Sequence, residues 1–333
     1  MKMNQRMNNP EIHEVISARL RNSRSPLILS HIRPDGDAIG SLIGTGLALT
    51  NAGKMPLLVL EDGLPVKYRF LTGSDFIMDK IKDSFDLVIA LDCSDLRRIG
   101  SLAVDISVDI NIDHHITNEN FADINLVLPE IPATSAILAE FLPNWGYPLD
   151  KISASAFLMG ILTDTIGFRT SNVTPETIRL AAQLMELGAD LSGIYTHALV
   201  TQSYTASVLW GKALSRLVRE NGLIWTAITL SDRKEAGYSG RDDADLTNVL
   251  SVIEGCDVSI LFNEQIGGKV KVSWRSNAPY DVSWVAQQFG GGGHPPASGA
   301  ELEGTLEEVE KKILSFTKKY MKDIHSKGDL KNG

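Results

Sequence analysis

The chain has 333 residues, 43% of them hydrophobic and 22% charged, which is typical of a soluble globular protein with two domains. Its net charge of −9 argues against a broad basic surface for long nucleic acid, and no apolar run reaches the roughly 18 residues of a membrane helix. Two cysteines, Cys93 and Cys256, give no disulfide framework and fit a cytoplasmic protein.

The first 190 residues alternate between short apolar runs, which predict strands, and helical apolar spacings. We expect these elements, in order: helix 11–22, strand 26–30, helix 39–51, strands 56–60, 86–91 and 107–113, edge strand 122–128, helices 133–142 and 152–162, and a helix from 175 that Gly188 ends. The order indicates an α/β domain with a mainly parallel sheet flanked by helices.

A second pattern follows a helical stretch at 192–220, which we interpret as a connector between domains. We expect strand 223–230, helix 243–254, strands 257–263 and 269–275, helix 282–289 and a charged closing helix 306–325. The predicted organisation is a larger α/β domain at 1–190, a helical linker at 191–220 and a smaller α/β domain at 221–325.

Side chains able to bind metal follow the first strand. His31, Asp35 and Asp37 occupy the turn that leads into the next helix. Two carboxylates separated by one residue repel each other, and a bound divalent cation is the usual way to hold such groups close. The alternative is that Asp37 is only the N-terminal cap of that helix.

Three further elements end in residues of the same kind. Asp92 and Asp113-His114-His115 each close a predicted strand, and Asp164 ends a buried helix. One aspartate at a strand end is more often a turn residue or a cap. Several together mark the sheet edge at which α/β proteins bind ligands.

The combined set offers oxygen and nitrogen donors and no thiolate: His31, Asp35, Asp37, Asp92, His114, His115 and Asp164. This mix suits Mn²⁺ or Mg²⁺ better than structural zinc, and imidazole ligands favour Mn²⁺. So many candidates exceed the needs of one ion. Two ions about 3.5–4 Å apart, sharing a bridging carboxylate, would use them and would activate water against a phosphorus centre.

A run of four glycines at 290–293 precedes His294 and two prolines. Glycine lets a backbone approach an anion closely, so the run predicts contact with a phosphate group. The alternative is a flexible linker, which fits less well because His294 and Pro295 follow directly.

Taken together, the motifs resemble those of the DHH phosphoesterases in order and spacing. The matching segments are the His-x-x-x-Asp-x-Asp turn, the strand-end Asp92, Asp113-His114-His115 and Asp164. The Gly291-Gly-Gly-His294 stretch is similar to the signature of the DHHA1 substrate domain. The resemblance covers nearly the whole chain, and its nearest match is the stand-alone NrnA type, described as a nanoRNase and 3′-phosphoadenosine-5′-phosphate (pAp) phosphatase.

The resemblance also implies a role for each matching residue. The first ion would be bound by His31, Asp35 and Asp92, and the second by Asp37, Asp92, His114 and Asp164. Asp113 would orient an imidazole, and His115 would face the scissile phosphate. Substrate would be bound by Arg275, His294, Gly292, Gly293, Arg169 and Asn172. For Arg275, the alternative is an ordinary surface salt bridge.

The implied activity is two-metal hydrolysis that releases 5′-nucleotides from very short oligonucleotides or phosphate from pAp, with the second domain gripping the substrate across a cleft. Mn²⁺ or Mg²⁺ would be the cofactor, and neither long nucleic acid nor a membrane would be a partner; a homodimer stays open. The alternatives are a linear or cyclic dinucleotide (pApA, c-di-AMP) phosphodiesterase, a RecJ-type processive exonuclease, a family II inorganic pyrophosphatase and a non-catalytic nucleotide sensor. The acidic charge argues against the exonuclease, the missing lysine-rich C-terminal signature against the pyrophosphatase, and the filled ligand positions against the sensor.

Overall fold

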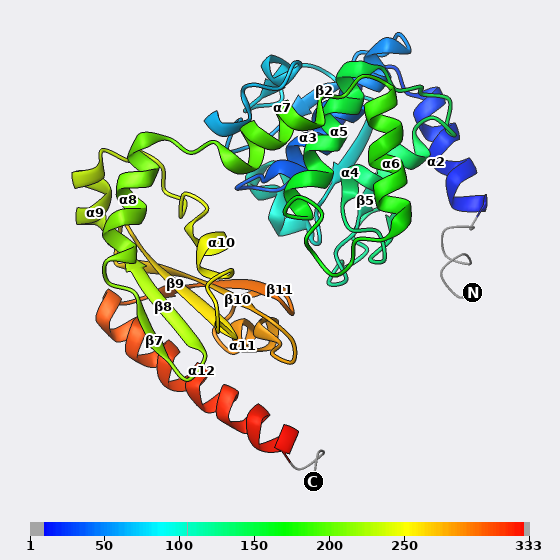
Figure 1. The fold of residues 1–333 in the computed structure, drawn as a ribbon. Coiled ribbons are helices and arrows are strands. Elements are labelled where there is room, and N and C mark those ends of the chain that lie inside the picture. Colours follow the sequence, from blue (N-terminus) through cyan, green and yellow to red (C-terminus); the bar gives the residue numbers. More distant parts are fainter. Residues whose placement is uncertain (1–9, 105, 330–333) are drawn as a thin grey trace. The chain divides into compact units, whose positions relative to one another are not determined.

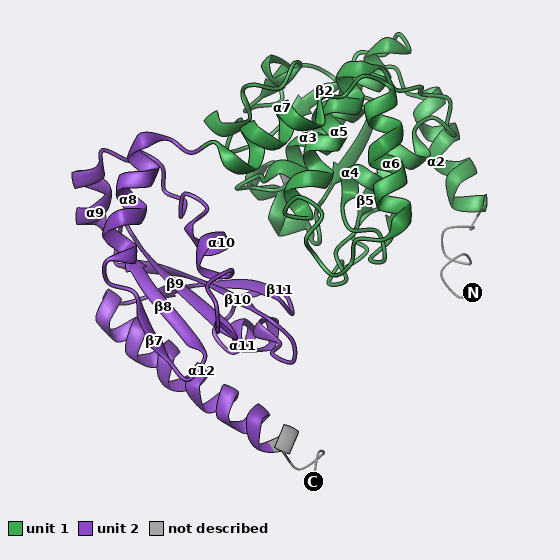
Figure 2. Cartoon of the chain, viewed as in Figure 1, with its two compact units in different colours: residues 1–201 green, residues 202–333 purple. Residues whose placement is uncertain are grey.

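The chain folds into two compact units, unit 1 with residues 1–201 and unit 2 with residues 202–333 (Figure 2). The computed structural model describes residues 10–104 and 106–329. The boundary between the units falls after Thr201, within the stretch 191–220 that was expected to connect two domains. Each unit contains its own six-stranded sheet and its own hydrophobic core.

Unit 1 is built on a sheet in which all paired strands are parallel, which confirms the predicted α/β class. Its strands are β1 Pro26–Leu29, β2 Leu57–Val59, β3 Ile77–Met78, β4 Leu87–Leu91, β5 Ile110–Asp113 and β6 Ile124–Val127. Every residue of β1, β4 and β5 is buried, as expected for central parallel strands covered on both faces.

The strand order in this sheet is β3-β2-β1-β4-β5-β6. The chain therefore runs outward from β1 to one edge and then returns to start again at β4, beside β1, where Leu27 is in register with Val88. The segments that leave β1 and β4 diverge, and in open α/β sheets such a reversal opens a crevice at the carboxyl ends of the strands. Every strand-end candidate is thereby directed toward one edge of the sheet.

Helices of unit 1 cover one face of the sheet, and irregular segments cover the other (Figure 1). The helices are α2 Pro10–Asn22, α3 Gly36–Asn51, α4 Thr134–Phe141, α5 Lys151–Asp164, α6 Pro175–Glu186 and α7 Leu191–Tyr195, followed by a π-helical turn, Thr196–Val200. Short 3₁₀ turns lie at Val66–Tyr68, Ser74–Phe76 and Leu96–Ala103. Ile28 and Ile89 point into the helical layer, whereas Leu27 and Val88 face the irregular segments.

Helices α3 and α5 pack closely because glycine lies where they meet. A Cβ atom added to Gly40 would lie 2.5 Å from the backbone oxygen of Ala156 and 2.9 Å from the backbone nitrogen of Gly160. Such distances are below van der Waals contact, so only glycine allows this approach. The close contact brings the first turn of α3, with Asp37, near the last turn of α5, with Asp164.

Unit 2 contains a mixed sheet of order β11-β12-β10-β9-β8-β7, in which only the β8–β9 pair is parallel. Its strands are β7 Val218–Glu220, β8 Leu223–Ile228, β9 Val258–Gln265, β10 Lys269–Ser276, β11 Gly292–His294 and β12 Ala297–Glu303. Its helices are α8 Tyr204–Leu214, α9 Leu230–Ala236, α10 Leu246–Leu250, α11 Val282–Gln287 and α12 Leu306–Asp329.

Three expectations for unit 2 need correction. The helical pattern assigned to 192–220 is wrong at its end, because Val218–Glu220 is strand β7 and pairs with β8. The strand expected at 223–230 stops at Ile228, since Thr229 caps α9. The helix expected at 243–254 is only Leu246–Leu250. No helix among residues 10–104 and 106–329 has both the length and the apolar character that a membrane span requires.

Candidate metal centre

Strand β1 delivers the first group of candidates. His31 lies just beyond its end, buried, and Asp35 precedes the first turn of α3. Asp35 Oδ1 accepts hydrogen bonds from the backbone nitrogens of Asp37 (3.0 Å) and Ala38 (3.1 Å). Asp35 is therefore the N-terminal cap of this helix, and the alternative that assigned this role to Asp37 is wrong.

Asp92, directly after β4, lies at the centre of the cluster. Its side chain is buried, and its backbone has φ +60°, a left-handed conformation that is uncommon outside glycine and found at functional sites. One carboxylate oxygen, Oδ2, lies 3.5 Å from His31 Nε2, and the other, Oδ1, lies 3.7 Å from His114 Nε2. The two oxygens thus face two different imidazoles.

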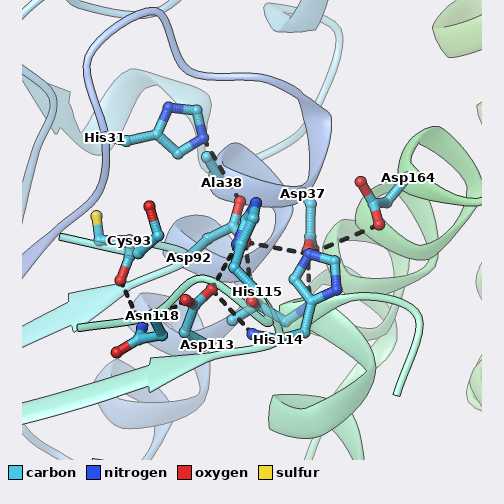
Figure 3. A network of polar contacts seen from close by, with 12 residues as sticks. His31, Asp37, Ala38, Asp92, Cys93, Asp113, His114, His115, Asn118 and Asp164 are labelled. Carbon is cyan, nitrogen blue, oxygen red and sulfur yellow. Dashed lines mark hydrogen bonds and ion pairs between the residues drawn. The ribbon is translucent and has the colours of Figure 1, made fainter. Parts of the chain in front are cut away.

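The Asp113-His114-His115 segment ends β5 and is held by a buried polar network. Asp113 Oδ1 accepts the backbone N–H of His114 (2.9 Å) and lies 2.7 Å from His115 Nδ1. Asn118 Nδ2 donates to Asp113 Oδ2 at 2.5 Å and to Asn111 Oδ1 at 2.8 Å. Asp113 is fully buried, so this network fixes the imidazole of His115 and the backbone of His114 (Figure 3).

Asp37 and Asp164 complete the cluster from α3 and α5. His114 Nε2 lies near both carboxylates, 4.0 Å from Asp37 Oδ2 and 3.7 Å from Asp164 Oδ2 (Figure 3). Asp37 also accepts the backbone N–H groups of Thr134 (2.6 Å) and Ser135 (2.9 Å) at the start of α4. Helix α4 has no side-chain cap of its own, so Asp37 caps it from another helix.

The seven candidates that follow strands and helices of unit 1 are thus brought together, and their donor atoms form three overlapping groups that can hold a metal ion. Within each group the atoms lie within 4.8 Å of one another. The groups are His31, Asp35 and Asp92; Asp37, His114 and Asp164; and Asp92, His114 and His115. Asp92 and His114 each belong to two groups, so one ion does not account for the arrangement.

The donor atoms fit a metal ion. His31 Nδ1 lies 2.9 Å from the Ile32 carbonyl and donates to it, which leaves Nε2 with a lone pair directed at Asp35 and Asp92. This Nε2 is buried and has no hydrogen-bond partner among the described residues. Orphaned buried nitrogens are rare and need an explanation, and a cation between the imidazole and the carboxylates provides one.

The electrostatics of the cluster point in the same direction. Burial raises the pKa of Asp37 and that of Asp164 well above the usual range, and neighbouring carboxylates raise both further. Burial alone would lower the pKa of His115, but the Asp113 hydrogen bond and the charge of Asp92 raise it to about 10. The cluster thus brings negative charges close together, and a divalent cation would compensate them.

The cluster is open on one side. Asp35 is 59% exposed at its side chain, Asp164 is 30% exposed and His115 is 20% exposed, whereas Asp92 is 2% exposed. A small ligand can therefore approach from the side of Asp35, Asp164 and His115. Arg169 and Asn172 lie exposed in the loop that follows α5, and among the described residues no hydrogen bond or ion pair joins the side chain of either to the cluster.

The remaining candidates lie in unit 2. Arg275 is on β10, where its guanidinium Nη1 donates to the Trp274 carbonyl at 3.0 Å and makes no salt bridge with a described residue. Gly292, Gly293 and His294 form the edge strand β11. A Cβ atom on Gly293 would lie 2.5 Å from the Ala297 carbonyl, and its φ is +137°, so this position requires glycine.

Thr134 contacts the metal-ligand candidates, and the sequence did not predict this. Its hydroxyl donates to Asp92 Oδ1 at 2.9 Å, in addition to its backbone contact with Asp37. In the sequence it reads as an ordinary Thr-Ser pair at a helix start, and such pairs are usually local caps. Nothing in that pattern shows that the residues they bind lie on α3 and after β4.

Comparisons with known proteins agree with the fold. The model of the DHH family, N-terminal domain, matches residues 26–161, and that of the DHHA1 domain matches residues 226–323. The bifunctional oligoribonuclease and PAP phosphatase NrnA of Thermus thermophilus is 35% identical, over 86% of this chain and 87% of that protein. The cyclic-di-AMP phosphodiesterase GdpP of Geobacillus thermodenitrificans is 26% identical, over 90% of this chain and 48% of that protein. A crystal structure of an exopolyphosphatase-related protein from Bacteroides fragilis superposes with a TM-score of 0.86 at 26% identity, covering 94% of this chain and 98% of that one.

A parallel α/β sheet with a histidine–aspartate cluster able to hold metal at its switch point, followed by a second α/β unit, is typical of a class of phosphoester hydrolases. The chain belongs to the DHH phosphoesterase family, with a DHH domain in unit 1 and a DHHA1 domain in unit 2. Within that family the chain is similar to proteins named NrnA, such as the one from Thermus thermophilus.

Proposed function

We propose that this chain is a two-metal phosphohydrolase that degrades very short oligonucleotides to 5′-nucleotides and removes phosphate from pAp. The observation that carries the proposal is the sharing of Asp92 and His114 between donor groups, because it provides adjacent places for two cations. The name of the Thermus relative supports the substrate class. Both cysteines are free, which supports a cytoplasmic location.

Two divalent cations, Mn²⁺ before Mg²⁺, are the proposed cofactor. His31, Asp35 and Asp92 would hold the first, and Asp37, Asp92, His114 and Asp164 the second. When bound, such ions polarise a phosphoryl oxygen and lower the pKa of water. The donor set contains oxygen and imidazole nitrogen without sulfur, which favours Mn²⁺ over zinc.

His115 is the proposed group that faces the scissile phosphate. Its Nδ1 donates to Asp113, so Nε2 is the nitrogen that would donate a proton or a hydrogen bond to the substrate, and the side chain is 20% exposed. A charged imidazole there would stabilise negative charge on the phosphate and supply a proton to a leaving oxygen. Asp113 holds the ring in this orientation and contributes to its positive charge.

Unit 2 is proposed to bind the substrate, through the phosphate contacts of Arg275 and His294 and the backbone of Gly292 and Gly293. β11 is the edge strand of its sheet, so backbone N–H groups on its outer side are not used by a neighbouring strand. Arg169 and Asn172 are proposed as further contacts from unit 1. The proposed domains are 1–190 for catalysis, 191–220 for the linker and 221–325 for substrate binding.

Substrate length tests the proposed function. With Mn²⁺, we expect hydrolysis of pAp and of RNA of about two to five nucleotides, with no further gain in kcat/KM for longer strands. Long-strand binding depends on many cation–phosphate contacts, and a chain of net charge −9 has few cations to spare. The measurement is kcat/KM at fixed salt on a 5′-labelled RNA ladder whose lengths run from about two to about 24 nucleotides.

The same assay contains its controls. Chelation of the metal by EDTA must stop hydrolysis of every substrate. A steady rise of kcat/KM with length would replace the proposal by a processive exonuclease. Because the Geobacillus relative is named a cyclic-di-AMP phosphodiesterase, pApA and c-di-AMP belong among the substrates tested. A clear preference for either would favour a dinucleotide phosphodiesterase over the proposed function.

Arg275→Ala is expected to lower kcat/KM by roughly 10- to 100-fold, mainly through KM, without changing metal content. A hydrogen bond to a charged group contributes about 1.5–3 kcal/mol, and 1.36 kcal/mol corresponds to a factor of ten. Lys271→Ala is the matched control, because Lys271 lies on the same strand and the same face of the sheet. Unchanged kinetics for Arg275→Ala on pAp would remove unit 2 from the proposed substrate site.

A further inference from the structure

Thr134, the first residue of α4, contacts two metal-ligand candidates at once. Its backbone nitrogen donates to Asp37 Oδ2 at 2.6 Å, and its hydroxyl donates to Asp92 Oδ1 at 2.9 Å. The residue is 0% exposed, so water does not compete for either bond. A single residue thus links a carboxylate of α3 to a carboxylate that follows β4.

The two carboxylates need such a link. Each is buried, and two negatively charged carboxylates repel each other, which tends to push them apart. They come from separate elements, and Asp92 has a left-handed backbone conformation that packing must maintain. Asp37 and Asp92 belong to different donor groups that share His114, so their separation affects the distance between adjacent cation positions.

We infer that Thr134 is a positioning residue, which holds Asp37 and Asp92 at a fixed separation and thereby sets the affinity of the centre for divalent cations. The inference rests on the proposed function, since it takes these carboxylates to be metal ligands. The hydroxyl occupies one lone pair of Asp92 Oδ1 and restricts rotation of the carboxylate, whose Oδ2 then stays directed at His31. Groups that orient a ligand in this way typically change metal affinity or activity by about 10- to 100-fold when they are removed.

The chemistry of threonine allows a clean test. Thr134→Val replaces the hydroxyl by a methyl group of similar size and keeps the backbone N–H that binds Asp37. Thr134→Ser keeps the hydroxyl and should restore parental binding. Thr45→Val is the matched control, because Thr45 is also a buried threonine of unit 1, and its hydroxyl has no hydrogen-bond partner among the described residues.

The experiment is calorimetric titration of Mn²⁺ into the metal-free full-length protein, with circular dichroism to confirm folding. We expect the dissociation constant for Mn²⁺ to rise by about 10- to 100-fold in Thr134→Val and to stay at the parental value in Thr134→Ser and Thr45→Val. If Thr134→Val does not fold, Thr134→Ala removes the same hydroxyl with a smaller side chain, and the same rise is expected.

Parental Mn²⁺ affinity in a folded variant without the hydroxyl would overturn the inference. So would an equal loss of affinity in Thr134→Ser, because the hydroxyl would then not be the cause. The two proposals fail differently. If the parental protein itself binds no divalent cation, the two-metal function is wrong; if it binds Mn²⁺ and Thr134→Val binds equally well, only the role of Thr134 is wrong.

Discussion

Replacing Asp92 with alanine is expected to lower kcat for pAp hydrolysis by at least about 10³-fold while unit 1 stays folded. Each oxygen of this carboxylate faces a different imidazole, His31 or His114, so its loss removes a proposed ligand of both ions. The fold should persist because the hydrophobic core of unit 1 stays intact and because the repulsion between Asp92 and the carboxylates of Asp37 and Asp164 disappears. The measurements are hydrolysis at saturating Mn²⁺ and circular dichroism of the metal-free protein.

Asp92→Asn separates the effect of charge from that of backbone conformation. Asparagine tolerates a left-handed backbone and can still accept the Thr134 hydroxyl, but its neutral amide is a poor metal ligand. We therefore expect it to be as inactive as Asp92→Ala. Near-parental activity in either variant, or metal analysis that finds one zinc ion bound by a cysteine, would contradict the two-metal centre.

Gly40→Ala is expected to reduce the free energy of unfolding of unit 1 by about 3 kcal/mol, the upper end of the range for overpacking. The added methyl group would lie 2.5 Å from the Ala156 oxygen, and backbone atoms cannot move aside as a flexible side chain can. For a domain of this size the midpoint of thermal unfolding should fall by roughly 6–12 °C. The separation of α3 and α5 should also weaken Mn²⁺ binding, because these helices carry Asp37 and Asp164.

Gly211→Ala is the matched control for this substitution. Gly211 lies inside helix α8, is exposed, and has no atom within 4 Å of a Cβ added there. The change should stabilise α8 by up to about 1 kcal/mol, the difference in helix propensity between the two residues. Differential scanning calorimetry of the two variants decides the question, and an unaltered unfolding midpoint for Gly40→Ala would show that the α3–α5 contact is looser than the structure indicates.

Much of unit 1 could be predicted because its chemistry is local in the sequence. Central parallel strands are buried on both faces, so β1, β4 and β5 appear as apolar runs, and a polar residue directly after such a run lies at the sheet edge. This rule alone places His31, Asp92 and His114 at the same edge. The structure brings their donor atoms together, as the order of motifs led us to expect.

The features that escaped prediction depend on contacts between distant residues. Val218–Glu220 continues a helical pattern but becomes β7, because β8 offers it a pairing partner. The cap of α4 is Asp37, far away along the chain, so no local signal identifies it. The alternative in which Asp37 caps α3 fails for a related reason: the carboxylate of Asp37 accepts N–H groups of α4, and Asp35 caps α3 instead.

Because Asp37 of α3 caps α4, not every proposed metal ligand can be replaced without a loss of stability. Position 37 is a poor choice for a substitution meant to give a nucleotide-binding protein without catalysis. Alanine there would leave the first N–H groups of α4 unsatisfied inside the protein, and loss of the cap alone would cost about 1 kcal/mol of stability. Asp164 is the better position, since it accepts no hydrogen bond from another described residue and is partly exposed. A substitution of Asp164 would remove catalysis and leave the structure around β1 and β4 unchanged, so that new ligands could be bound there.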